Sequence, residues 1–332
     1  MASSLVKMDV KDRKILHYLS IDARMPDILL AKKVGLSRNA IAYRIERLKR
    51  EGVIKFFTCT VNSCSLGYIP FTLLLKFNED IYEHPEIVSY FKKHENTFWL
   101  TTLSGQWDIF VEMVCKHVFH LQEILSKIVG NFGAKLYSYE LYFSFGTLRT
   151  QLLVEDFYEG IRVEKVPVRV MKFYGVTELD TLDRGIIQTL ATDSTTQYLT
   201  IAQKLGTNIN VVRSRIKKLM ELGTLVKFYP EISYPIIGYT EYLCRIKLKT
   251  IDPTQLGAIQ RYIKNHGQIM YAFYDPLHSA LLFTCAFKTP MGIEHLCRAF
   301  RKSFLGIVET QDYFIITQQV IFTPFPKGIT LG

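Results

Sequence analysis

The fold of this chain is decided by one stretch, Ser37-Arg-Asn-Ala-Ile-Ala-Tyr-Arg-Ile-Glu-Arg-Leu-Lys-Arg-Glu-Gly52. Ser37 is a good N-cap, because its side-chain oxygen can accept a hydrogen bond from a backbone N–H of the first turn. Gly52 can take the left-handed conformation that ends a helix. The apolar residues Ile41, Ile45 and Leu48 fall on one face of such a helix. The helix therefore buries one stripe and presents a basic surface.

The residues before this stretch predict two further short helices, over 9–20 and 26–34, and a tight turn at Gly35 leads into Ser37. Three short helices with a glycine turn before the last are typical of a helix-turn-helix unit, whose final helix enters the major groove of DNA. A basic helix face alone is usually a solvated surface. In this context it predicts a recognition helix.

The expected DNA contacts follow from position along this helix. Side chains that read bases need donors and acceptors on the groove side, and cations hold the phosphates. Three residues at the leading end lie off the apolar stripe and are predicted at the base edges: Arg38, Asn39 and Tyr43. Ser37, the N-cap, is also predicted to contact DNA. Three more are predicted at phosphates: Arg44, Arg47 and Arg50. An alternative role for Arg44 is to brace the unit through Asp12 or Asp22.

The pattern restarts past residue 150, at a constant offset of 171 positions. Arg44, Leu48 and Gly52, for example, recur as Arg215, Leu219 and Gly223, which indicates a tandem duplication. The second recognition helix is predicted over 208–222, with these residues at DNA: Asn208 (also the N-cap), Asn210, Arg213, Ser214, Arg215, Lys217 and Lys218. Ile209 and Ser214 replace Arg38 and Tyr43, so unlike half-sites are expected.

Between the two helix-turn-helix units, the pattern of strands and helices is β-α-β-β-α-β, the ferredoxin-like arrangement, with a closing strand over 136–145. The predicted fold class is therefore α+β, with two repeats of a helix-turn-helix unit and a ferredoxin-like domain. The expected boundaries are 1–54, 55–150, 177–225 and 226–326, with a join over 151–176. Apolar and charged residues alternate over 161–172, which predicts a strand or packed arm.

Composition limits the function. The chain has 332 residues, 48% of them hydrophobic, and a net charge of +10, which favours a polyanionic partner. Its six cysteines form no Cys-x-x-Cys pair, and no apolar run approaches the roughly 20 residues of a membrane span. No signal peptide is evident, so a cytosolic protein with free thiols is expected. Neither a catalytic motif nor a metal or cofactor motif is present, which favours a protein that is not an enzyme.

The sequence resembles the leucine-responsive regulator/AsnC (Lrp/AsnC) family of prokaryotic transcription regulators. The resemblance rests on Met8-Asp9-x-x-Asp12-Arg13-x-Ile15-Leu16, Asp22-Ala23-Arg24, Ala31-x-x-Val34-Gly35-Leu36-Ser37, Arg44-Ile45-x-x-Leu48-x-x-x-Gly52-Val53-Ile54 and Gly105-x-x-Asp108. It implies a winged or plain helix-turn-helix, a ferredoxin-like sensing domain (RAM domain), further assembly, and an amino-acid effector near Gly105 and Asp108. The second repeat has Pro276-Leu277-His278-Ser279 at the last motif and lacks its glycine and acid.

Two arrangements of the heads are open. One chain can pair its own repeats into a pseudo-dimer that reads an asymmetric site, or two chains can form a homodimer with four heads. Two other functions are also open. The same architecture occurs in siroheme decarboxylases, which are tetrapyrrole enzymes, and a companion subunit could modify another regulator without touching DNA.

Overall fold

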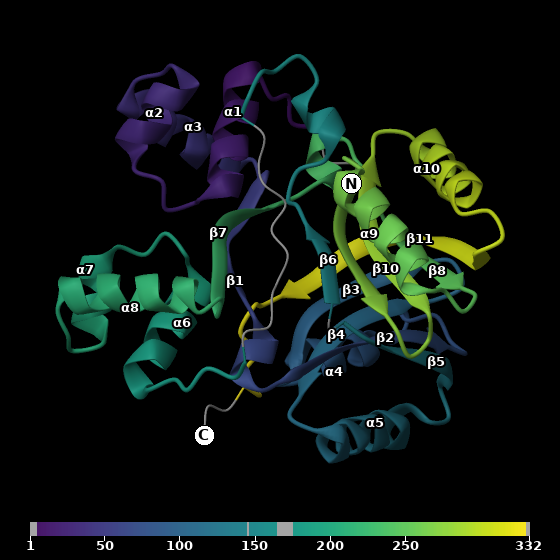
Figure 1. Ribbon diagram of the computed structural model, residues 1–332. Coiled ribbons are helices and arrows are strands. Elements are labelled where there is room, and N and C mark those ends of the chain that lie inside the picture. Colours follow the sequence, from purple (N-terminus) through teal and green to yellow (C-terminus); the bar gives the residue numbers. More distant parts are fainter. Residues whose placement is uncertain (1–4, 145, 165–174, 330–332) are drawn as a thin grey trace.

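The computed structural model describes residues 5–144, 146–164 and 175–329. Each repeat begins with three helices and a strand, which we call a head. The first head comprises α1 (Val10–Ile21), α2 (Asp27–Val34), α3 (Arg38–Arg50) and β1 (Ile54–Val61). The second comprises α6 (Thr181–Thr192), α7 (Tyr198–Lys204), α8 (Ile209–Glu221) and β7 (Leu225–Ile232). The predicted helix-turn-helix units are confirmed in both repeats (Figure 1).

Each head is followed by a ferredoxin-like domain. The first contains β2 (Ile69–Phe77), α4 (Pro85–Lys93), β3 (Thr97–Ser104), β4 (Ile109–Cys115), α5 (Val118–Phe132) and β5 (Leu136–Phe143). The second contains β8 (Thr240–Leu248), α9 (Pro253–Asn265), β9 (Ile269–Asp275), β10 (Ala280–Phe287), α10 (Pro290–Ser303) and β11 (Val308–Phe322). The predicted α+β class is confirmed.

The strands of the two domains join into one nine-stranded sheet, in the order β5-β2-β4-β3-β11-β8-β10-β9-β6. The junction is the antiparallel pair of β3 and β11, in which Ser104 lies opposite Ile315 and Trp99 opposite Phe322. The expected closing strand over 136–145 is wrong in its extent, because β5 ends at Phe143. The chain then forms β6 (Gly146–Thr150), which pairs with β9 of the second repeat.

The two halves of this sheet also face each other. Leu74 and Phe110 of the first repeat form a buried cluster with Leu243, Phe273 and Phe314 of the second. On the opposite faces, α4 and α5 cover the first half and α9 and α10 cover the second. The sheet face left open in each ferredoxin-like domain is thus covered by the other repeat.

An ionic group accompanies this apolar contact between the repeats. The Arg245 guanidinium, only 6% exposed, contacts the carboxylates of Glu140 from the first repeat and Asp312 from the second. Lys247 donates to the other oxygen of Glu140 at 2.9 Å. Buried charges of this kind require their partners, so the network favours one relative placement of the two domains.

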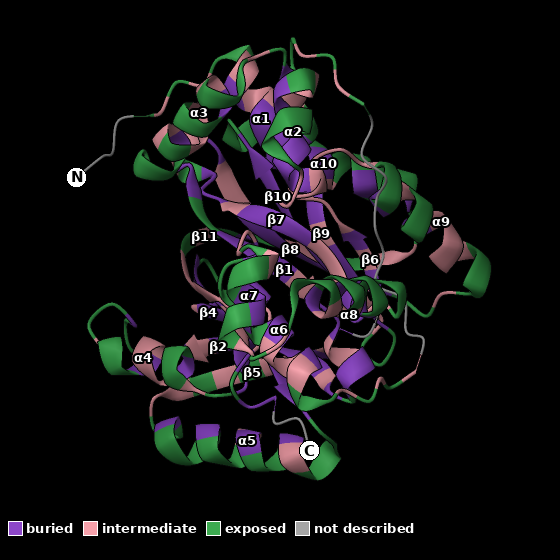
Figure 2. Ribbon diagram, turned by 90° about the vertical axis from the view of Figure 1, so that its left-hand side faces the viewer, coloured by how far each residue is buried: buried purple, intermediate pink, exposed green. Residues whose placement is uncertain are grey.

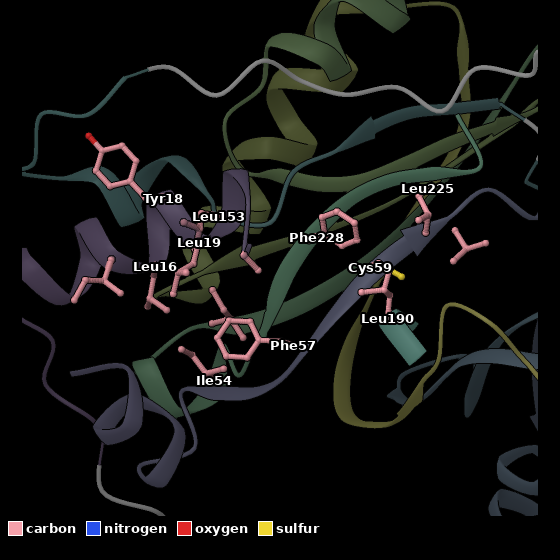
Figure 3. Close-up of a cluster of buried hydrophobic side chains, with 14 of the residues drawn as sticks. Leu16, Tyr18, Leu19, Ile54, Phe57, Cys59, Leu153, Leu190, Leu225 and Phe228 are labelled. Atoms are coloured by element: carbon pink, nitrogen blue, oxygen red, sulfur yellow. The ribbon is translucent and has the colours of Figure 1, made fainter. Parts of the chain in front are cut away.

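Strands β1 and β7 form a separate two-stranded antiparallel ribbon between the heads, with Phe57 opposite Pro230 and Cys59 opposite Phe228. Helix α1 packs on β7 and α6 on β1, so each head is completed by a strand of the other. Figure 3 shows the buried cluster that results, with Leu16 and Leu19 of α1 near Phe57 and with Leu190 of α6 beside Cys59. The two heads therefore share one core.

The join between the repeats packs along the first head. After the short 3-10 helix Glu155–Tyr158, the Glu159 carbonyl accepts from Arg13 Nη1 at 2.6 Å, and Glu164 lies 3.1 Å from Lys33 Nζ. Residues 161–164 have no regular secondary structure, so no strand begins there. The rest of the predicted arm, 165–172, lies outside the described residues. No helix in the described part of the chain has the length and apolar character to cross a membrane.

Candidate nucleic-acid interface

Helices α3 and α8 lie on one side of the molecule, with the β1–β7 ribbon between the heads (Figure 1). Figure 2 views that side and shows both helices with long exposed faces. The predicted N-caps are confirmed, because Ser37 Oγ accepts from the Ala40 N–H at 3.2 Å and Asn208 Oδ1 from the Val211 N–H at 3.0 Å. Each helix thus begins with its capping side chain engaged by the backbone.

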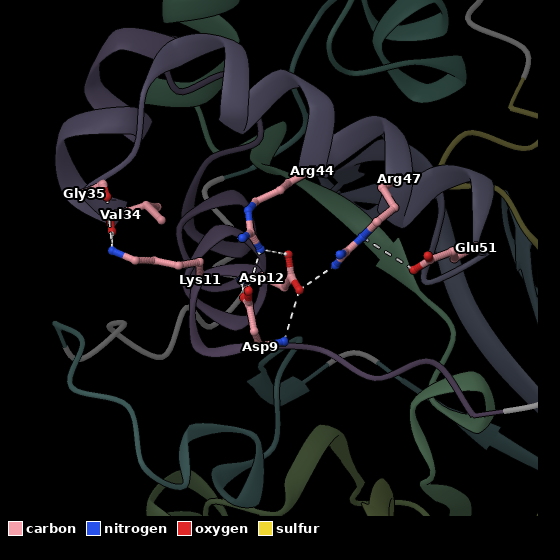
Figure 4. A network of polar contacts seen from close by, with 8 residues as sticks. All are labelled: Asp9, Lys11, Asp12, Val34, Gly35, Arg44, Arg47 and Glu51. Atoms are coloured by element: carbon pink, nitrogen blue, oxygen red, sulfur yellow. Dashed lines mark hydrogen bonds and ion pairs between the residues drawn. The ribbon is translucent and has the colours of Figure 1, made fainter.

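The buried carboxylate of Asp12 accepts hydrogen bonds from both α1 and α3 of the first head (Figure 4). Arg44 Nη1 donates to Asp12 Oδ1 at 2.7 Å and to Asp9 Oδ2 at 2.8 Å, and Arg47 Nη2 donates to Asp12 Oδ2 at 2.5 Å. Hydrogen bonds to Asp9 and then to Asp12 raise the pKa of Arg44. Asp12 Oδ2 also accepts from the Asp9 N–H at 3.0 Å, which completes a capping box at α1.

This network ties the recognition helix to α1. The alternative role of Arg44 is therefore what the structure shows, with Asp12 and Asp9 as its partners rather than Asp22. Arg47 is held in the same way, although the sequence predicted it at a phosphate. Contact of either arginine with DNA stays a prediction. Both side chains already form ion pairs with aspartates, so each would contact a phosphate while paired.

The second head repeats the arrangement with fewer contacts. Arg215 Nη1 lies 2.7 Å from Asp180 Oδ2 and 3.1 Å from Asp183 Oδ2. The charge of Asp183, before that of Asp180, raises the pKa of Arg215. Lys218 stands where the first head has Arg47, and Asp183 Oδ1 has no hydrogen-bond partner among the described residues. The second recognition helix is therefore braced by one arginine instead of two.

The other predicted residues present their side chains to solvent. In the first head Tyr43 is 64% exposed and the Arg38 side chain is 69% exposed, with Arg38 Nε 3.6 Å from Asp27 Oδ2. The remaining exposed residues of the prediction are Asn39, Arg50, Asn210, Arg213, Ser214, Lys217 and Lys218. Arg213 lies over the Tyr198 ring at 5.6 Å. The two surfaces differ, since only the first carries an arginine and a tyrosine at these positions.

Paired hydrogen bonds relate the heads by a pseudo-twofold axis. The Ala23 N–H donates to the Phe228 carbonyl at 3.0 Å, and the Ser194 N–H donates to the Phe57 carbonyl at 3.3 Å. These two bonds are equivalent at the offset of 171 residues. So are the bonds from Asn62 to Thr224 and from Ser233 to Val53, each 2.9 Å long. The two heads are therefore more alike in their backbone hydrogen bonds than in the side chains of their recognition helices.

Arg24 joins the heads asymmetrically and was missed as a site residue by sequence reasoning. Its Nη1 donates to the carbonyls of Ser194 at 2.5 Å and Thr196 at 2.9 Å, and its guanidinium lies 4.4 Å from the centre of the Tyr198 ring. The second repeat has Thr195 at the equivalent position. The available signal was the Asp22-Ala23-Arg24 motif, which did not indicate a contact with the other head.

The predicted effector residues Gly105 and Asp108 lie in and beside the hairpin between β3 and β4. Asp108 Oδ1 accepts from Lys76 Nζ and Oδ2 from the Phe77 N–H, both at 2.8 Å. Gly105 has φ +135° and lies against Phe314, where a Cβ would come within 3.1 Å of the ring. Both residues thus have a structural explanation in the turn and in the contact between repeats. Their contact with an effector stays a prediction.

The heads and sheets define a tandem helix-turn-helix protein of α+β class. The AsnC-type helix-turn-helix domain matches residues 8–49 and again residues 179–220. HTH-type transcriptional regulator FL11 of Pyrococcus furiosus is 32% identical over 122 residues, which are 36% of this chain and 80% of that protein. An uncharacterized HTH-type transcriptional regulator of Pyrococcus abyssi is 30% identical over 108 residues, 32% of this chain and 72% of its own. This chain belongs to the Lrp/AsnC family.

A solved structure matches both repeats together. The siroheme decarboxylase NirDL superposes with a TM-score of 0.64 at 13% identity, covering 96% of this chain and 97% of NirDL. At that identity the likeness shows the fold alone. The fold of two fused units is therefore shared between this chain and an enzyme, whereas the sequence relatives just described are named as regulators.

Proposed function

We propose that the protein is a sequence-specific, double-stranded DNA-binding transcription regulator whose two unlike heads read an asymmetric site. The observation that carries this proposal is the presence of two exposed recognition helices on one side of a single chain, with different side chains at their leading ends. The family and its regulators support it, and so does the net charge of +10.

The proposal includes a division of roles along α3. Arg38, Asn39 and Tyr43 are exposed at its leading end, where side chains of a recognition helix meet base edges. Arg50 is exposed at the other end and suits a phosphate. We assign Arg44 to orienting the helix through Asp12.

In the second head, Asn210, Arg213 and Ser214 take the base-reading positions, and Lys217 and Lys218 suit phosphates. Arg215 takes the bracing role of its counterpart in the first head. The two heads would therefore share their backbone geometry and read different bases. The arginine–aspartate ion pairs would position each recognition helix, and the exposed side chains would determine which bases it contacts.

The chain is proposed to act as an intramolecular pseudo-dimer. The shared core of the heads, the symmetric hydrogen bonds of the ribbon and the packed sheet halves support this arrangement, because each repeat covers an apolar face of the other. Light scattering tests it directly. A monomeric chain that binds one site as a monomer supports the proposal, and a stable dimer that needs both chains for DNA binding contradicts it.

Selection from genomic DNA tests the function itself. The purified protein is incubated with fragmented DNA of its source at physiological salt, and the retained fragments are sequenced. We expect an enriched site with two dissimilar halves about one helical turn, or a multiple, apart. Arg38→Ala with Asn39→Ala should lose the enrichment, whereas Lys127→Ala, an exposed change on α5, should keep it.

If no genomic fragment is enriched, the proposal that the protein binds specific DNA sequences is refuted. A companion subunit would then be the better account, and charge reversal over 38–50 would leave its action intact.

The second candidate is a tetrapyrrole enzyme, favoured by the NirDL fold. Siroheme carries many carboxylates, whereas the cavity between the ribbon and the sheet is lined by three glutamates and one lysine. This excess of acidic side chains opposes a polyanionic substrate. Titration with an iron tetrapyrrole distinguishes the candidates: no shift of the Soret band is expected, and a saturable shift would favour the enzyme.

A further inference from the structure

A cavity of about 210 Å³ lies between the β1–β7 ribbon and the nine-stranded sheet. Both repeats contribute to it, with Thr60 and Trp99 from the first and Tyr229 and Tyr271 from the second. This is many times the space that one water molecule needs, so the cavity has room for a small organic metabolite. Neither Gly105 nor Asp108 lines it. The cavity is therefore separate from the effector position that the family resemblance implied.

Three carboxylates from three different strands line this cavity. Glu112 of β4 is 1% exposed and accepts from Tyr271 OH at 3.1 Å and Thr72 Oγ1 at 3.3 Å. Glu231 of β7 accepts from Gln319 Nε2 at 3.0 Å. Glu241 of β8 has no hydrogen-bond donor within the described ranges. Glu241 is half-buried at the cavity wall, so its carboxylate is free to accept a hydrogen bond from a donor that a ligand brings.

Two of these glutamates have no acidic counterpart in the first repeat. At the offset of 171 residues, Glu231 occupies the position of Thr60 in the first repeat, and Glu241 occupies that of Pro70. Both counterparts also line the cavity. The backbone of the cavity thus follows the pseudo-twofold, while the second repeat supplies acids at two positions where the first repeat has a threonine and a proline.

The rest of the lining indicates what kind of ligand body the cavity can hold. It is largely apolar, with Phe98, Trp99, Met270 and Phe322 among its residues. The Trp99 indole N–H has no hydrogen-bond partner among the described residues. Within the same part of the chain, no cluster of His, Cys, Asp or Glu has the geometry of a metal site. An organic cation fits this lining better than a metal ion, because its apolar body would cover the aromatic side chains.

We propose that this cavity binds a small organic amine, with its ammonium group at Glu241 and Glu231 and its apolar body against Trp99 and Phe322. The ligand would touch the ribbon through Glu231 and the sheet through Glu241, so it would link the heads to the ferredoxin-like domains. The regulatory meaning of this link rests on the proposed DNA-binding function. The binding of the amine itself does not.

The protonation of the carboxylates supports this geometry. Burial raises the pKa of Glu112 and of Glu241 to about 7, and burial also raises that of Glu231. Hydroxyl groups of Tyr271 and Thr72 face Glu112. The charge of Lys55 opposes the shift at both Glu231 and Glu241, with Lys227 also acting on Glu231. An ammonium group would favour the ionised carboxylates, so binding should release protons near neutral pH.

Calorimetry of the full chain without DNA tests the proposal. The probes are propylamine, phenethylamine and tryptamine, and tryptophol is the matched neutral control, since a hydroxyl replaces its amine. We expect tryptamine to bind at least about tenfold more tightly than tryptophol. We also expect its affinity to rise between pH 6 and 8, because the carboxylates lose protons while the amine stays charged. Buffers of different ionisation enthalpy should reveal the released proton.

Glu241→Gln keeps the shape of the side chain and removes its charge. It should weaken tryptamine binding at least about tenfold. Glu123→Gln, an exposed change on α5, should leave it unaltered. Glu231→Gln provides a second variant, and circular dichroism verifies that each variant is folded.

Equal binding of tryptamine and tryptophol would overturn the proposal, as would unchanged tryptamine binding in both cavity variants. Absence of heat with all three amines at millimolar concentration would also overturn it. These outcomes are independent of DNA recognition, which is measured separately by the genomic selection. A chain that binds amines and no DNA would therefore refute the regulator while retaining the cavity.

Discussion

Asp12→Asn tests the reasoning about the recognition helix most sharply, because this carboxylate holds two arginines of α3 and the N-terminus of α1. Removing one partner of a buried charge pair costs about 3–5 kcal/mol. The side chains of Arg44 and Arg47 are 22% and 24% exposed, so water recovers part of that cost. We therefore expect a loss of about 2–4 kcal/mol in the local stability of the first head.

Asp183→Asn is the matched change in the second head. Among the residues that the structure describes, only Arg215, at 31% exposure, pairs with this carboxylate. We expect a loss of about 1–2 kcal/mol there. Hydrogen exchange of the full chain, followed by mass spectrometry of α3 and α8 peptides, measures each head separately.

A tenfold change in exchange corresponds to about 1.4 kcal/mol, so α3 should exchange roughly 30- to 700-fold faster in Asp12→Asn. In Asp183→Asn, α8 should exchange roughly 5- to 30-fold faster. Asp27→Asn, which alters an exposed ion pair with Arg38, is the control and should change little. Equal acceleration in both heads, or none in the first, would refute the bracing role given to Asp12.

Other predictions follow from the same structure. Arg50→Ala should reduce the slope of log affinity against log salt by about 0.9, as expected for one lost phosphate contact, and electrophoretic titrations over a salt series would measure it; an unchanged slope would remove Arg50 from the phosphate list. Burial raises the pKa of Glu112 from 4.5 to about 7, so between these values Glu112 is protonated in the folded state and ionised in the unfolded state. Stability should therefore fall as pH rises from about 5 to 8, and Glu112→Gln should flatten that fall in urea titrations; a parallel curve would contradict the assignment. Arg24→Ala removes bonds to Ser194 and Thr196 and should loosen the second head against the first, seen as faster exchange at 193–198; unchanged exchange there would limit Arg24 to a surface contact.

The elements with local signals were predictable from the sequence. Ser37 and Asn208 cap their helices as expected, because capping depends on neighbouring backbone groups. The apolar stripe of Ile41 and Leu48 is buried as its period requires. The β-α-β-β-α-β order likewise appears in both domains. Each of these features follows from residues within one element or from the order of the elements along the chain.

The features that join distant residues were not predictable in this way. Pairing of β1 with β7, and of β6 with β9, depends on how two repeats dock, which no short pattern records. The charge of Arg47 indicated a phosphate contact, whereas the fold brings Asp12 within 2.5 Å of it. The cavity acids lie on separate strands and share no spacing. Their common site became visible only with the sheet and ribbon in place.

In the proposed function, one chain reads one site with two different heads. The most direct test compares Asn39→Ala and Asn210→Ala on the selected genomic site, with every base pair substituted in turn. We expect each variant to relax discrimination at one position, by about 1–3 kcal/mol, in opposite halves of the site. If both variants relaxed both halves, each half would be read by both kinds of head, and the asymmetric pseudo-dimer would be contradicted.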